Sequence, residues 1–92
     1  MSEPFDVRVG PAAVRQLHRL PAGVAFAIIE FVTVTLPGNP LRLTKPLSGD
    51  FDGLRSARRG EYRVLVRVDP EARVVLVVRV AHRALAYWPP AP

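Results

Sequence analysis

The sequence contains no cysteine and only two histidines. Neither a disulfide nor a thiolate zinc site can therefore hold the fold together, and its stability must come from packing. We expect no metal and no cofactor. Lysine is almost absent as well: the sequence has one lysine, Lys45, and twelve arginines. The positions of these arginines carry more information than their number.

Long apolar runs are also missing. The longest apolar tract, residues 24–36, contains Glu30 and falls short of the roughly 20 residues that a membrane-spanning helix needs. The first residues include Glu3 and Asp6 instead of basic side chains followed by an apolar stretch, which argues against a secretory leader. We expect a cytoplasmic protein that does not enter a membrane.

The chain is long enough for one domain, residues 1–92, and its 49% hydrophobic content can supply a core. Its formal charge of +5 is unevenly distributed. Residues 1–40 hold three arginines against three acids, whereas residues 41–92 hold nine arginines and Lys45 against five acids. This asymmetry predicts an acidic partner such as nucleic acid. A solvated basic face that maintains solubility is the alternative.

The first half of the chain predicts a strand and two helices. Alternation of Phe5, Val7 and Val9 with polar residues is typical of a half-buried strand. Pro11 can open a first helix, and a second is expected over residues 21–36, before a stop at residues 37–40. Apolar residues cover more than one face of the second helix. It is either buried on several sides or has apolar surface left for a protein partner.

The second half predicts three strands after a connector at residues 41–49. Residues 54–59 and 61–68 form a hairpin around Arg59-Gly60, and a turn at residues 69–72 leads into a last strand over residues 73–81. The fold class is thus α+β: a strand, a helix pair, and a three-stranded antiparallel meander whose sheet has one helical face.

Alternation of side chains along a strand predicts where the arginines point. On the second hairpin strand, we expect Tyr62, Val64, Val66 and Val68 to face the helices, with Arg63, Leu65 and Arg67 opposite. On the last strand, the residues expected to face the helices are Val74, Leu76, Val78 and Val80. Those expected on the other face are Arg73, Val75, Val77, Arg79 and, if the strand extends, Arg83. The result would be a basic surface for a single-stranded backbone.

Arginine holds phosphate through two parallel hydrogen bonds and stays charged, so it can stabilise a phosphate transition state but is a poor proton carrier. Cleavage of RNA by its own 2′-hydroxyl also requires proton transfer, for which Tyr87 and His82 are the candidates. We prefer Tyr87, because strand parity directs His82 towards the helices. A tyrosine used for packing or base stacking is the alternative.

Several motifs resemble the RelE/ParE superfamily of toxins from type II toxin-antitoxin modules, and within it the RelE-like branch. They run nearly end to end: Arg19-Leu20-Pro21, Asn39-Pro40, Lys45-Pro46-Leu47, residues 53–64, and His82-Arg83 with Tyr87. The resemblance implies a ribosome-dependent mRNA endonuclease, or mRNA interferase, that inhibits translation. It also implies a cognate RelB-like antitoxin that forms a hetero-oligomer with the toxin, and the ribosome and mRNA as further partners.

The resemblance also implies residue roles. Arg63 would stabilise the scissile phosphate, Arg83 would do the same or protonate the leaving group, and Tyr87 would be the base. The remaining residues expected to bind RNA are Arg55, Arg58, Arg59, Arg67, Arg79, Lys45 and His82. Arginines stand where a relative uses lysines, which leaves the acid and base open. The alternatives are a ParE-like gyrase inhibitor without nuclease activity and a non-catalytic RNA-binding module.

Overall fold

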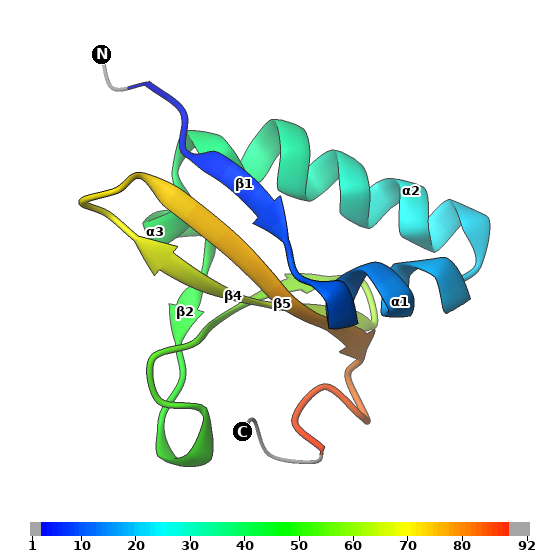
Figure 1. The fold of residues 1–92 in the computed structure, drawn as a ribbon. Helices are drawn as coiled ribbons and strands as arrows, with labels where there is room; N and C mark the ends of the chain where they lie inside the picture. The colour runs from blue at the N-terminus through cyan, green and yellow to red at the C-terminus, as the bar shows by residue number, and fades with distance from the viewer. Residues whose placement is uncertain (1–2, 89–92) are drawn as a thin grey trace.

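The computed structural model of the chain describes residues 3–88. Its α+β fold, as predicted, has one five-stranded sheet in the order β1-β5-β4-β3-β2, with helices α1 and α2 along one face (Figure 1). Strand β1 pairs parallel with β5, and the other neighbours are antiparallel. The strands are β1 (Asp6–Val9), β2 (Lys45–Pro46), β3 (Arg55–Arg59), β4 (Tyr62–Asp69) and β5 (Val74–His82).

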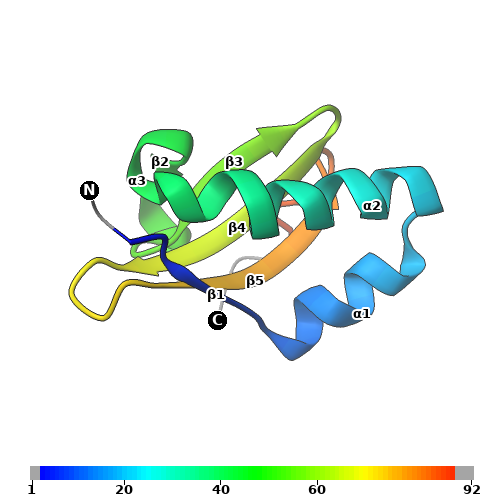
Figure 2. The same cartoon turned by 90° about the horizontal axis from the view of Figure 1, so that it is seen from above.

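The two predicted helices are present. Helix α1 (Pro11–Arg19) begins at a proline, whose fixed backbone angle suits the first turn. Helix α2 (Ala22–Glu30) continues through a π-helical turn (Phe31–Thr35) and a 3-10 turn (Leu36–Gly38), so the helical run reaches the predicted stop. Seen from above, α2 lies across the sheet and α1 lies beside β5 (Figure 2). Among residues 3–88, no helix is long and apolar enough to cross a membrane.

The main core lies between the helices and the sheet. Ile28, Phe31, Val32 and Leu36 from the helical run are each at most 3% exposed. They meet a set of buried sheet residues: Ala57, Val64, Val66, Val75, Val77 and Val80. The predicted orientation of the β4 side chains is therefore confirmed, since Val64 and Val66 face the helices with Tyr62 and Val68 packed beside them.

A second, smaller cluster lies on the other face of the sheet. Leu54, Leu65 and Ala86 are its buried members. Phe51, from the 3-10 turn Gly49–Phe51, packs against them. This cluster draws the segment before β3 and the segment after β5 towards the same sheet face. Figure 1 shows both segments on the side away from α2.

The predicted orientation of β5 was wrong for residues 74–78. Leu65 pairs with Arg79 but Val66 pairs with Val77, so a bulge leaves Val78 without a partner in the register. As a result Val75 and Val77 join the helix-side core, whereas Val78 packs in the smaller cluster. An uninterrupted run of apolar residues gives no alternation from which such a bulge can be read. Arg73, which was expected on the basic surface, instead lies in the preceding turn and stacks over Phe5 at 4.4 Å.

The predicted connector at residues 41–49 also contains regular structure. Asn39 caps the short helix α3 (Pro40–Leu43), with its side chain accepting a hydrogen bond from the Arg42 amide. Strand β2 follows and pairs with β3, placing Lys45 opposite Ser56. A two-residue strand containing a proline has no readable period, which explains the error. This edge strand carries the chain's single lysine to the sheet.

Candidate nucleic-acid interface

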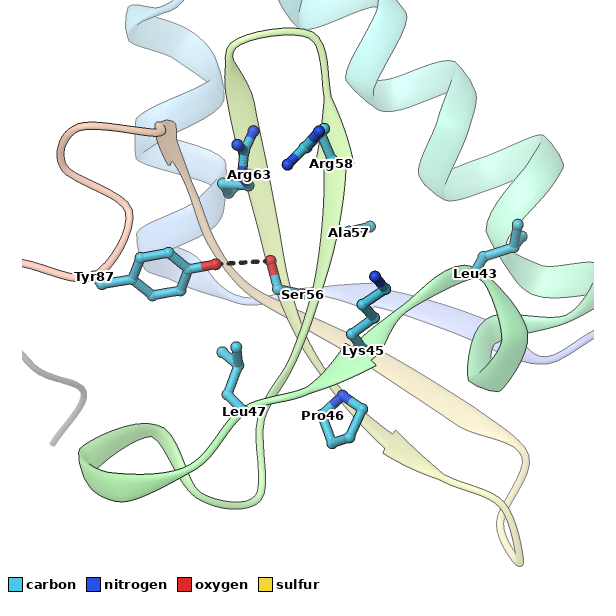
Figure 3. Close-up of a pocket in the computed structure, with 9 residues that line it drawn as sticks. All are labelled: Leu43, Lys45, Pro46, Leu47, Ser56, Ala57, Arg58, Arg63 and Tyr87. Carbon is cyan, nitrogen blue, oxygen red and sulfur yellow. Dashed lines mark hydrogen bonds between the residues drawn. The ribbon is translucent and has the colours of Figure 1, made fainter.

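A cleft of about 600 Å³ lies over β2, β3 and the start of β4. Figure 3 shows the nine residues that line it: Leu43, Lys45, Pro46, Leu47, Ser56, Ala57, Arg58, Arg63 and Tyr87. We call it the cationic cleft. Segments from three parts of the sequence form it: residues 43–47, the β3-β4 hairpin, and the segment that follows β5.

The hairpin places two arginines side by side at one end of the cleft. Arg58 on β3 is opposite Arg63 on β4 in the register. Gly60 makes the connecting turn with a φ of 57°, a conformation that glycine adopts without strain. The Arg63 Nη1 donates to the Tyr62 carbonyl at 3.1 Å and to the Gly60 carbonyl at 3.3 Å. Backbone contacts thus hold the Arg63 guanidinium at the base of the hairpin turn.

Tyr87 forms one side wall of the cleft. Its hydroxyl lies 3.1 Å from the Ser56 Oγ (Figure 3). Its ring meets Phe51 edge to face, with centroids 5.5 Å apart and an interplanar angle of 81°. The Tyr87 side chain remains open to solvent, since the residue is 39% exposed. It can therefore contact a bound ligand while its ring and hydroxyl are both held.

The cleft has cations that no acid neutralises. Within residues 3–88, the Lys45 ammonium and the Arg58 guanidinium make no hydrogen bond or ion pair, and no carboxylate lines the cleft. Two positive side chains on neighbouring strands, with Arg63 beside them, repel one another unless an anion enters. This arrangement suits a phosphodiester, whose oxygens can accept from both guanidinium and ammonium groups.

Two of the arginines predicted to bind RNA lie on the helical face of β3. Arg55 donates from Nε to the Thr44 Oγ1 at 2.7 Å, and from Nη2 to the Leu41 and Thr44 carbonyls. Arg59 stacks over the Phe31 ring at 3.6 Å. Sequence parity left open which β3 arginine would join the basic surface. The structure brings Arg58 into the cleft and gives Arg55 and Arg59 contacts that fasten other elements to the sheet.

Four other predicted residues also lie outside the cationic cleft. Arg67 and Arg79 line a separate cavity of about 260 Å³ on the face of the smaller cluster. His82 meets the Tyr62 ring edge to face at 5.5 Å, on the helical side as parity predicted. Arg83 pairs with Glu61 at 3.0 Å, with both side chains 61% exposed. Any RNA contact by these residues would extend beyond the cleft.

Sequence reasoning did not single out Ser56, although the residue stands within a quoted motif. Its hydroxyl forms a hydrogen bond of 3.1 Å with the Tyr87 hydroxyl. The available signal was its spacing of two residues from Arg58, which puts both on one strand face. Among the residues that the structure describes, no group of three or more His, Asp or Glu side chains could hold a metal ion.

Comparison with known proteins identifies the class. The chain has the fold of small toxins solved in toxin-antitoxin complexes. It superposes on the structure of the RelBE2 toxin-antitoxin complex from Mycobacterium tuberculosis with a TM-score of 0.85 and 44% identity, covering 91% of this chain and 97% of that one. An E. coli RelE mutant in the free state, at 19% identity and a TM-score of 0.74, shares the fold over 97% of this chain and 95% of its own.

The family follows from the sequence matches. Residues 7–87 match the model described as the ParE toxin of the type II toxin-antitoxin system parDE. Toxin RelG of M. tuberculosis is 45% identical over 91% of this chain and 97% of its own length, and Toxin RelE of the same organism is 44% identical over 91% and 87%. The chain belongs to this family of type II toxins. The predicted resemblance to the RelE/ParE superfamily and its RelE-like branch is confirmed.

Proposed function

We propose that this toxin is a ribosome-dependent endonuclease that binds mRNA in the cationic cleft and cuts it. The observation that carries the proposal is the meeting of Lys45, Arg58, Arg63 and Tyr87 around one open cavity without a carboxylate among its lining residues. The 44–45% identity to Toxin RelE and Toxin RelG supports it. Translation stops because the message is destroyed during decoding, in the cytoplasm.

The proposed reaction uses the RNA's own nucleophile. The 2′-hydroxyl next to the scissile phosphate loses its proton to a base and forms a bond to phosphorus. The bond from phosphorus to the 5′-oxygen breaks, and that oxygen takes up a proton. The products are a 2′,3′-cyclic phosphate and a 5′-hydroxyl, so no water is consumed in this step. Such chemistry requires charge stabilisation and two proton transfers.

The cleft residues divide these tasks by their chemistry. Arg58 and Arg63 stabilise the negative charge that grows on the phosphate oxygens, since guanidinium groups stay protonated. Tyr87, in its phenolate form, accepts the proton of the 2′-hydroxyl and becomes a neutral phenol. The Lys45 ammonium carries a transferable proton for the 5′-oxygen and points into the cleft from β2 (Figure 3). The apolar side chains of Pro46 and Leu47 offer a surface against which a nucleobase of the RNA can pack.

A RelB-like antitoxin is the proposed protein partner. The 44% identical relative was solved as a toxin-antitoxin complex. The helical run also leaves apolar side chains on the surface, with Phe26 68% exposed and Val34 71% exposed. Such surface suits a protein chain that covers the toxin in a hetero-oligomer. An antitoxin of this kind, added in equimolar amount, is expected to abolish cleavage.

Mapping of RNA 5′ ends in a translating extract tests the proposal. We expect cuts at defined codon positions, with 5′-hydroxyl ends, that disappear when ribosomes are removed. A 2′-deoxy substitution at the nucleotide before the cut should block cleavage there, because it removes the nucleophile. Intact mRNA at saturating toxin would refute the endonuclease.

The matching family model supports a second candidate function, because the description of that model names the ParE toxin. A ParE-like protein would inhibit DNA gyrase without cutting RNA. The same preparations should therefore be assayed for gyrase supercoiling. Blocked supercoiling together with intact mRNA would select this second function.

A further inference from the structure

We propose that Ser56 is a positioning residue for Tyr87 in the cleavage reaction, an inference that rests on the proposed function. The two side chains come from positions 31 residues apart, on β3 and on the segment after β5, and their oxygens are 3.1 Å apart. Their contact closes one side of the cationic cleft (Figure 3). Among residues 3–88, Ser56 is the one hydrogen-bond partner of the Tyr87 hydroxyl.

The backbone that carries Tyr87 is held at a defined place. Ala86 is fully buried in the smaller cluster, and its carbonyl accepts a hydrogen bond of 2.9 Å from Arg79 Nη1. Phe51 then meets the Tyr87 ring at its edge. These contacts limit where the ring can lie, but they do not set the direction in which the phenolic oxygen forms a hydrogen bond. Ser56 supplies that last constraint.

Strand geometry relates the pair to the phosphate-binding end of the cleft. Ser56 and Arg58 are two residues apart on β3, so their side chains share a face and stand about 7 Å apart along the strand. A hydroxyl bound to Ser56 therefore lies on the same strand face as Arg58, which is opposite Arg63 in the register. This spacing fits a base that takes a proton from a 2′-hydroxyl while the adjacent phosphate lies on the arginines.

The serine hydroxyl is suited to this task because it can both accept and donate. It can donate to the Tyr87 oxygen in the phenolate form that takes the 2′-hydroxyl proton, and it can accept from the neutral phenol that this proton transfer leaves. A methyl group can do neither. Threonine keeps the hydroxyl and should preserve the function at this half-buried strand position.

Single-turnover cleavage on programmed ribosomes tests the proposal. Ser56→Ala should lower the rate at saturating ribosomes about tenfold, equivalent to ~1.4 kcal/mol, while the half-saturating concentration changes by less than about twofold. Ser56→Thr should restore most of the rate. Ser48→Ala is the matched control, because Ser48 is exposed and its side chain makes no capping hydrogen bond.

A double-mutant cycle separates positioning from general damage to the cleft. In the Tyr87→Phe background, Ser56→Ala should cause less than about a twofold further loss, since the hydroxyl that it positions is gone. Equal losses in both backgrounds, or a loss confined to ribosome binding, would overturn the inference. Full activity of Ser56→Ala would also overturn it while leaving the endonuclease intact.

Tyrosine NMR adds a readout that does not depend on cleavage. The chain has two tyrosines, so protein labelled with ¹³C at tyrosine Cζ gives two signals, and Tyr87→Phe assigns them. Ser56→Ala should shift the Tyr87 signal and leave that of Tyr62 in place. An unshifted Tyr87 signal would show that the hydrogen bond is absent. If the unmodified toxin never cuts mRNA, the proposed function fails first, and the catalytic role of Ser56 fails with it.

Discussion

Arg63→Ala removes the guanidinium that the structure holds most firmly in the cationic cleft. Two backbone carbonyls orient Arg63, and Arg58 lies opposite it in the register. Loss of one preorganised donor to a transition-state oxyanion typically costs 10²–10³ in rate. Because Arg58 remains to bind the same phosphate, we expect the lower end, about 10²-fold or ~2.7 kcal/mol of barrier.

The loss should appear in the chemical step and not in folding. Arg63 has no carboxylate partner among the described residues, so its truncation leaves no buried charge unpaired. The free energy of unfolding should therefore change by less than about 1 kcal/mol. Single-turnover cleavage on programmed ribosomes measures the rate, with Arg15→Ala as the control, since Arg15 is an exposed arginine on α1. A folded Arg63→Ala toxin that cuts within about twofold of the unmodified rate would refute the assignment.

Three further predictions test other contacts. Arg58→Ala should weaken RNA binding and reduce the slope of log K against log salt by about 0.7, the value for one phosphate on a single strand; an unchanged slope would place Arg58 outside the phosphate path. Thr44→Val should cost about 1–3 kcal/mol in urea denaturation, because the buried hydroxyl accepts from Arg55 and its loss leaves that donor unpaired. Arg83→Ala should lower stability by less than about 1 kcal/mol, because its ion pair with Glu61 is exposed. Tenfold slower cleavage by Arg83→Ala would extend the site beyond the cleft.

The fold was predictable from sequence wherever a physical period was visible. Helix α1 begins at the predicted Pro11, and the helical run through α2 ends at Gly38, within the stop predicted at residues 37–40 and two residues beyond the predicted helix end at residue 36. Side chains of β4 alternate between the main core and the opposite sheet face, which correctly placed Val64 and Arg63 on opposite faces. Strand β5 has no alternation over residues 74–78, and there the bulge decided the orientation. Register is a property of two strands, so a single strand's composition could not reveal it.

The candidate site was only partly predictable for a related reason. Strand parity placed Arg63 on the face that carries the cleft, and both the need for a proton-transfer group and the motif resemblance pointed to Tyr87. Neither could show that Ser56 and Tyr87 meet, because their contact depends on how Leu54 and Ala86 pack in the smaller cluster. The short edge strand β2 places Lys45 in the cleft, and a strand of two residues is too short to show an alternating pattern in the sequence. Long-range packing, not local propensity, assembles the cleft.

The density of arginine in the second half of the chain overstates how many of these residues can hold phosphate. Arg55 fastens α3 to β3 through three hydrogen bonds, and Arg59 covers the Phe31 ring. Both use the long arginine side chain to join the helical layer to the sheet while its charge remains hydrogen-bonded or stacked. Arg58, one residue before Arg59, points to the other face and meets no such partner among residues 3–88. Strand alternation therefore divides neighbouring arginines between structure and cleft, and a substitution at either type should separate the two roles: stability on the helical face, cleavage on the other.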